Sequence, residues 1–124
     1  MRAKFIPRFF LFFATLLLSY NVFAFDSGHL GVIQATELPP EAQQTIRLIR
    51  QGGPFPYEKD GAVFGNYEKV LPQQKRGYYR EFTVKTPRAR NRGARRIVTG
   101  GEKGRASEYY YTADHYRSFK RVIE

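Results

Sequence analysis

Residues 38–53 read LPPEAQQTIRLIRQGG, and this segment carries the strongest helix signal in the chain. The Pro39–Pro40 pair suits a first helical turn, a glutamate follows near the positive N-terminal end, and Gly52 suits the C-terminal cap. Small and apolar side chains recur at helical spacing on one face, namely Ala42, Thr45, Ile46 and Ile49. A helix with one such face needs a sheet or a second helix to cover it.

After residue 53 the helical spacing ends. A stretch rich in glycine, proline and aromatic residues follows, and it predicts a long ordered loop with a short strand at 62–64. Runs of β-branched and aromatic residues separated by turn signals predict further strands at 78–85, 94–99, 108–112 and 118–123. Residues 25–36 show neither pattern, so we expect a loose lead into the helix. One helix followed by strands predicts an α+β domain with an antiparallel sheet.

The first 24 residues have the features of a secretory signal peptide. A basic start at 1–8 precedes the apolar run 9–18, and residues 22–24 read VFA, which suits a cleavage site. A membrane anchor would need about 20 apolar residues in a row, whereas the polar residues 19–21 interrupt this run early. We therefore expect cleavage after Ala24 and a secreted protein, extracellular or, in a source with an outer membrane, periplasmic. An uncleaved N-terminal anchor is the alternative.

The charge of the chain points to an anionic partner. The sequence has 21 Lys and Arg against 11 Asp and Glu, and three of the basic residues lie in the first 24, which leaves a formal charge of +7 on residues 25–124. Such an excess on a small domain favours nucleic acid, a membrane surface or an acidic protein as partner. There is no cysteine, so the sequence excludes a thiolate zinc site and a cysteine nucleophile.

Strand alternation places one glutamate beside arginines. Neighbouring side chains of a strand point to opposite faces, so Val84 on the core side places Glu81 on the other face. Ile97 on the core side places Arg96 on the face of Glu81, and Arg92 has the same parity as Arg96. If the two strands pair, a carboxylate proton acceptor lies beside a site for a phosphate-sized anion on an open sheet face. The alternative is a solvated surface ion pair, which contributes little to stability.

A histidine completes a possible catalytic set. His115 lies in YYYTADHYRSF, directly after a predicted strand and next to Tyr116. A glutamate base, a histidine acid and arginines for the phosphate form the set that general acid–base cleavage of RNA requires. Since a lone histidine is more often structural, the second reading is a non-catalytic basic module that binds RNA, anionic lipid or an acidic partner.

The chain resembles the small secreted guanyl-specific ribonucleases of microbes, the superfamily that includes barnase. The matching stretches span residues 38 to 119 and read LPPEA, GPFPYEKDGAVFGNYE, VLP, GYYREFTV, RGARRIVTG and YYYTADHY. The resemblance implies a microbial ribonuclease domain at 25–124, behind the signal peptide at 1–24. It also implies a fold, in which an N-terminal helix packs on one face of a twisted antiparallel sheet and the active site occupies the other face.

The resemblance also implies a role for each member of the catalytic set. Glu81 matches the general base that takes the proton of the ribose 2′-OH, and His115 matches the acid that protonates the departing 5′-oxygen. Arg92 and Arg96 match the arginines that bind the phosphate. The first step then yields a 2′,3′-cyclic phosphate, and water opens it to a 3′-phosphate in the second. Neither a metal nor a cofactor is required in this scheme, because the nucleophile belongs to the substrate.

The segment FGNYE at 64–68 matches the loop that holds guanine in this family. By the resemblance, Phe64 stacks on the base, and the backbone N–H groups of Asn66 and Tyr67 meet guanine O6 and N7. Glu68 accepts hydrogen bonds from N1–H and the N2 amine, which adenine cannot offer. Tyr116 contacts the phosphate or the nucleoside. Without the motif, Glu68 would be an ordinary surface carboxylate.

The resemblance further implies an RNA substrate, a monomer without stable membrane association after signal cleavage, and a small acidic inhibitor of the barstar kind. Some relatives join their chain ends by a disulfide, which this sequence cannot form. The other arginines raise the field that attracts RNA, although Arg95 could instead form a structural ion pair. The loop at 100–107 is expected to border the site.

Overall fold

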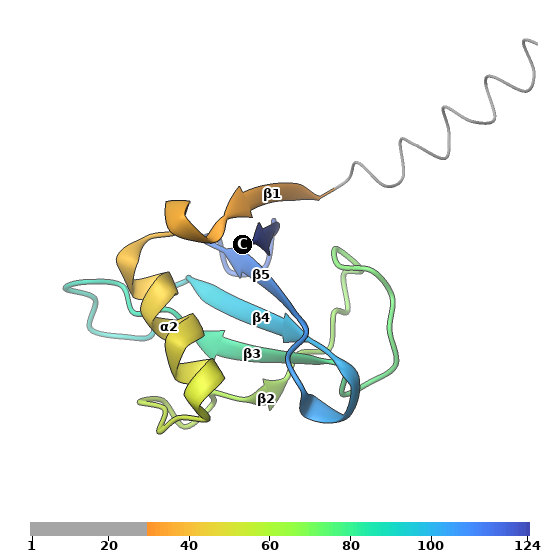
Figure 1. The fold of residues 1–124 in the computed structure, drawn as a ribbon. Coiled ribbons are helices and arrows are strands. Elements are labelled where there is room, and N and C mark those ends of the chain that lie inside the picture. The colour runs from red at the N-terminus through yellow and green to blue at the C-terminus, as the bar shows by residue number, and fades with distance from the viewer. Residues whose placement is uncertain (1–29) are drawn as a thin grey trace, which may run out of the picture. The chain divides into compact units, whose positions relative to one another are not determined.

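The computed structural model describes residues 30–124, so the predicted signal peptide lies outside the described residues (Figure 1). The elements in chain order are β1 (Gly31–Gln34), the 3-10 turn η2 (Ala35–Glu37), α2 (Pro40–Gln51), β2 (Ala62–Val63), β3 (Tyr79–Thr83), β4 (Arg96–Gly100), the 3-10 turn η3 (Glu102–Gly104), β5 (Glu108–Thr112) and β6 (Lys120–Ile123). Within this described range, no helix has the length and apolar character needed to cross a membrane.

Helix α2 begins and ends where the sequence predicts. Pro39 is extended and precedes the first turn, which contains Pro40. Gly52 ends the helix in the left-handed conformation, with φ 83°, and its N–H donates to the Ile49 carbonyl at 3.2 Å. Glycine adopts this conformation without the steric cost of a Cβ. The buried face consists of Ala42, Thr45 and Ile46.

The six strands form one sheet in the order β1-β6-β5-β4-β3-β2. The pairs from β2 to β6 are antiparallel, as predicted. The prediction of a loose lead at 25–36 is wrong for residues 31–34, which pair in parallel with β6 from Gly31↔Lys120 to Gln34↔Ile123. A strand of four residues is too short to show alternation, and its partner lies at the other end of the chain, so local pattern gave no signal for it.

The helix packs on one face of this sheet (Figure 1). The core cluster combines helix and strand side chains, which are Leu38, Ala42, Ile46, Val84, Ile97, Tyr111 and Val122. The opposite face of the sheet is not covered by α2. At one end of β3 it is covered by a loop, where the Tyr79 hydroxyl donates to the Pro72 carbonyl at 2.5 Å and Leu71 is buried. The α+β class with one helix on a sheet is therefore confirmed, and the sheet is mixed.

Candidate active site

The strand register brings Glu81 and Arg96 to the same face of the sheet. Glu81 pairs with Val98, and Thr83 pairs with Arg96, so all four side chains share one face. Ile97, between Arg96 and Val98, belongs to the core cluster on the helix side. The parity argument from the sequence is therefore confirmed by the pairing of β3 with β4.

Arg92 reaches this face from the loop before β4. Its Nη2 donates to Glu81 Oε1 at 3.2 Å, and its Nε and Nη2 donate to Thr83 Oγ1 at 3.0 and 2.8 Å. No residue of 30–124 accepts a hydrogen bond from its Nη1. Because the side chain is 27% exposed, those two N–H groups are accessible to an anion. Gly93, with φ 68°, separates this residue from the strand.

Arg96 is buried, and the expectation of an open sheet face is wrong at this position. The residue is only 3% exposed, and its guanidinium lies 5.9 Å from the centre of the Tyr116 ring. Nη1 donates to the carbonyls of Gly93 and Arg95 at 2.9 and 2.8 Å. Nε is buried and has no partner among the described residues. A buried, unpaired donor on a cation is unfavourable.

Only one of the two carboxylate oxygens of Glu81 accepts hydrogen bonds from the described residues. The hydroxyl of Tyr116 donates to Glu81 Oε1 at 3.0 Å, on the same oxygen that receives Arg92. Burial, and then the negative charge of Glu81, raise the pKa of Tyr116 to about 12, so its phenol is a neutral donor at neutral pH. Glu81 Oε2 accepts no hydrogen bond from residues 30–124, and the side chain is 17% exposed. This oxygen is therefore available to accept a proton.

His115 is placed by a turn that the sequence analysis missed. Thr112 Oγ1 accepts the Tyr116 N–H at 3.1 Å, and the His115 N–H donates to the Ala94 carbonyl at 3.0 Å. His115 is left-handed, with φ 56°, and its side chain is exposed. Asp114 closes the turn by accepting the Ser118 hydroxyl at 2.6 Å, which is the main cause of its lowered pKa. The Thr-x-Asp pattern with a serine four residues later is a local turn signal that was present in the sequence.

The predicted base-binding residues line one cavity of about 220 Å³ together with His115. Its walls are Phe64, Asn66, Tyr67, Glu68, Val70, His115, Tyr116 and Phe119. The Phe64 ring lies 4.8 Å from the Tyr116 ring, centre to centre. Glu81, Arg92 and Arg96 do not line this cavity, but Tyr116 lines it and also donates a hydrogen bond to Glu81. The two predicted groups of residues therefore meet at Tyr116.

The loop at 64–68 contributes four residues to the wall of the cavity. Asn66 is left-handed, with φ 53°, and its amide pairs with the backbone of Leu71 through Nδ2 to O at 2.9 Å and N to Oδ1 at 3.1 Å. The N–H groups of Asn66 and Tyr67 donate to no acceptor within 30–124. Glu68 is exposed and forms no ion pair or hydrogen bond with the described residues. These groups are free to bind a planar ligand with acceptor and donor edges.

Two further expectations concern Arg95 and the loop at 100–107. The structural alternative for Arg95 is confirmed, since its Nη2 pairs with Glu41 Oε1 at 3.2 Å and anchors the loop to α2. Whether the loop at 100–107 borders the site stays a prediction: its Glu102 pairs with Lys75 at 3.5 Å, and the neighbouring Arg76 donates to the Tyr67 hydroxyl at 3.4 Å. Gly100 pairs with Glu108, whereas Arg96 pairs with Thr112, so this loop lies at the opposite end of β4 and β5 from Arg96.

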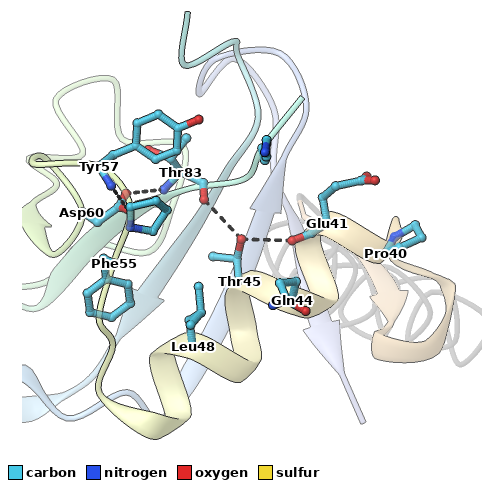
Figure 2. A pocket seen from close by; sticks show the side chains of 11 residues that line it. Pro40, Glu41, Gln44, Thr45, Leu48, Phe55, Tyr57, Asp60 and Thr83 are labelled. Atoms are coloured by element: carbon cyan, nitrogen blue, oxygen red, sulfur yellow. Dashed lines mark hydrogen bonds between the residues drawn. The ribbon is translucent and has the colours of Figure 1, made fainter. Parts of the chain in front are cut away.

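A larger cavity of about 460 Å³ lies elsewhere, between α2 and the loop at 55–60 (Figure 2). It contains none of the predicted site residues. The smaller region around Tyr116 offers a free carboxylate oxygen on Glu81, free guanidinium donors on Arg92 and the exposed imidazole of His115. Among residues 30–124, no three His, Asp or Glu side chains converge as a bound metal ion would require.

Several known proteins are similar to this chain in sequence and in fold. A family described as ribonuclease matches residues 24–123. Guanyl-specific ribonuclease St of Saccharopolyspora erythraea is 49% identical over 98 residues, which are 79% of this chain and 93% of that protein. Guanyl-specific ribonuclease Sa of Kitasatospora aureofaciens is 53% identical over 92 residues, which are 74% of this chain and 93% of that protein. A crystal structure of ribonuclease Sa2 with guanosine-2′-cyclophosphate has a TM-score of 0.69 and 47% identity, covering 76% of this chain and 96% of that one. Since the family match covers residues 24–123 and the relatives are matched over most of their length, the chain belongs to the ribonuclease family.

Proposed function

We propose that this ribonuclease is a guanyl-specific endoribonuclease that cuts single-stranded RNA on the 3′ side of guanosine. The observation that carries the proposal is the pairing of two neighbouring sites. A free carboxylate oxygen on Glu81, beside the unused Nη1 donors of Arg92 and the buried guanidinium of Arg96, lies near a cavity lined by His115 and by the residues of the loop at 64–68. The names of the relatives, and the guanosine nucleotide bound to ribonuclease Sa2, support guanine as the base.

In the proposed first step, Glu81 Oε2 removes the proton of the ribose 2′-OH. The 2′-oxygen then attacks phosphorus, the bond from phosphorus to the 5′-oxygen breaks, and His115 protonates that leaving oxygen. The product is a guanosine 2′,3′-cyclic phosphate. In the second step the two residues exchange roles: His115 removes a proton from water, the water oxygen bonds to phosphorus as the bond from phosphorus to the 2′-oxygen breaks, and Glu81 returns its proton to the 2′-oxygen, leaving a 3′-phosphate.

The arginines stabilise the charge that develops on the phosphate. Arg92 offers both Nη1 protons, and Arg96 adds a buried positive charge on the sheet face that carries Glu81. Donors that are oriented before the substrate arrives, in a site with little water, need no reorganisation during the reaction. The burial of Arg96 under Tyr116 supports such a role, because it fixes one cation in place.

Base recognition follows from the loop at 64–68. The unpaired N–H groups of Asn66 and Tyr67 suit guanine O6 and N7, and the unpaired Glu68 carboxylate suits N1–H and N2. Adenine would place a lone pair against Glu68 and leave its carboxylate unsatisfied. Phe64, already stacked near Tyr116, offers an aromatic surface for the base.

We propose further that the enzyme is secreted as a monomer and that a small acidic protein of the barstar kind inhibits it. The signal-peptide features of residues 1–24 support secretion. The positive formal charge of residues 25–124 supports an acidic inhibitor, since complementary charge accelerates association.

The test is a short RNA with a single G, incubated with the protein at low salt in EDTA. We expect one cut after G and a cyclic phosphate end. Glu81→Gln and His115→Ala should each lower the rate by roughly 10²- to 10⁴-fold without unfolding the protein. Glu68→Ala should slow cleavage after G far more than residual cleavage elsewhere. Glu102→Gln, in the loop at the far end of β4, is the matched control and should leave the rate unchanged. Binding without any cut would mean a basic module rather than an enzyme.

A further inference from the structure

Thr83 is buried in the sheet, yet its hydroxyl is the main support of Arg92. The residue is 4% exposed, and its Oγ1 accepts from Nε at 3.0 Å and from Nη2 at 2.8 Å. The bond from Arg92 to Glu81 is a single one at 3.2 Å. By number and length of bonds, the guanidinium is therefore fixed by the threonine more than by the glutamate.

This arrangement controls what Arg92 does to the general base. An arginine beside a carboxylate favours two parallel hydrogen bonds, one to each oxygen. Here Thr83 occupies Nε and shares Nη2, so Arg92 reaches only Oε1 of Glu81. Glu81 Oε2 remains free for a proton, and Nη1 remains free for a phosphate. Without the hydroxyl, the guanidinium would be able to turn onto both oxygens of Glu81.

The main chain of Thr83 is itself held by α2 and by the loop at 55–60. Its N–H donates to Asp60 Oδ1 at 2.7 Å, and its carbonyl accepts from Thr45 Oγ1 of α2 at 3.2 Å. The second oxygen of Asp60 accepts the Tyr57 N–H at 3.2 Å. Figure 2 shows Thr83 bonded to Thr45 and to Asp60, and Asp60 bonded to Tyr57, along the wall of the larger cavity. The hydroxyl thus stands on a backbone that is tied to both the helix and the loop at 55–60.

We propose that Thr83 is a positioning residue for the reaction, which fixes Arg92 toward the phosphate and keeps it from closing on both oxygens of Glu81. The inference rests on the proposed function for its effect on rate, but the position of Arg92 can be measured without RNA.

The test compares Thr83→Val, which keeps the branched shape but removes the hydroxyl, with Thr83→Ser, which keeps the hydroxyl. For Thr83→Val we expect kcat to fall by roughly 10- to 100-fold, since small displacements of a catalytic group have effects of this size. KM should change little, because the guanine cavity is separate. Thr83→Ser should retain most of the rate. Thr99→Val is the matched control: Thr99 is also buried, but it pairs with Arg80 on the adjacent strand and should leave kcat unchanged.

A double-mutant cycle shows whether Thr83 acts through Arg92. In an Arg92→Ala background, Thr83→Val should cause no further loss of kcat, because the group that it positions is gone. Full activity of Thr83→Val, or the same loss of kcat with and without Arg92, would overturn the proposal. Thermal unfolding of each variant separates a folding defect from this effect, and Thr83→Ser keeps the comparison available if the valine variant is unstable.

The arginine Nε–H signals in a ¹H–¹⁵N spectrum provide the readout without RNA. The signal that disappears in Arg92→Ala belongs to Arg92, and we expect it to be protected from exchange in the wild type and Thr83→Ser but not in Thr83→Val. If the wild type cut no RNA while this pattern held, the proposed function would fail and the positioning would stand. If RNA were cut but Arg92 were equally protected in Thr83→Val, the positioning alone would fail.

Discussion

Replacing Asn66 tests whether the guanine loop is held by one side chain. Two hydrogen bonds join this side chain to the backbone of Leu71, which is 2% exposed. At about 1 kcal/mol for each bond, Asn66→Gly should lower the free energy of unfolding by about 2 kcal/mol. Asn66→Ala should cost about 1 kcal/mol more, because φ is 53° at this position and a Cβ is unfavourable there.

Thermal unfolding measures these differences directly. For a domain of this size, a change of 1 kcal/mol shifts Tm by about 4–8 °C, so Asn66→Gly should lower Tm by roughly 8–16 °C. Lys69→Gly is the control in the same loop, since Lys69 is also left-handed, at φ 58°, but its side chain makes no hydrogen bond or ion pair with the described residues. It should leave Tm unchanged or raise it.

The functional consequence separates recognition from chemistry. Loss of the Asn66 contacts frees the loop that carries the two unpaired N–H groups, so the ratio of cleavage after G to cleavage after A should fall in both variants. Slow cleavage after other bases should persist, because Glu81 and His115 are untouched. Stability within about 0.5 kcal/mol of the wild type, together with an unchanged ratio, would refute the reasoning.

Three further predictions follow from single contacts. Asp114→Asn should destabilise the protein at neutral pH, because the pKa of Asp114 is lowered in the folded state. The stability that this carboxylate contributes is present above its unfolded pKa, near 3.9, and is lost as the pH falls through the folded pKa. The difference in unfolding free energy between wild type and variant, measured in urea, should therefore disappear in acid. Arg95→Ala should remove the pair with Glu41 and cost about 1 kcal/mol, while kcat stays at the wild-type value. Tyr116→Phe should remove one phenol that titrates near pH 12 in absorbance. Its raised pKa stabilises the folded state below about pH 10, and this stability is lost as the pH rises through the folded value, so alkaline destabilisation should be weaker in the variant.

Features encoded by neighbouring residues were predictable. The caps of α2, its buried face and the alternation that brings Glu81 and Arg96 together all depend on spacing within short segments. The role assignments came from the family motifs, and the structure collects the assigned residues around Tyr116. These two kinds of information explain why the fold class could be predicted from the sequence and why the roles of the site residues remain assignments by resemblance.

Features that join distant segments were not predictable. The burial of Arg96 depends on Tyr116, twenty positions later, folding over it. The support of Thr83 depends on Thr45, which is 38 residues away. No periodicity reports such a contact, because each partner looks like an ordinary polar residue in its own strand or helix. The turn at Asp114 is different, since its Thr-x-Asp signal was local and was overlooked.

The parallel pairing of β1 with β6 has a consequence for how the molecule folds. Gly31 pairs with Lys120, so the open sheet is complete only when β1, the first described strand, pairs with β6, the last. Contacts this far apart in sequence require a large loop to close and therefore form late and slowly. A ribosome releases the N-terminal strand long before its partner exists, and β1 has no pairing edge until residues 120–123 emerge. We therefore expect completion of this fold to follow the synthesis of residues 120–123 rather than to accompany the synthesis of the earlier strands.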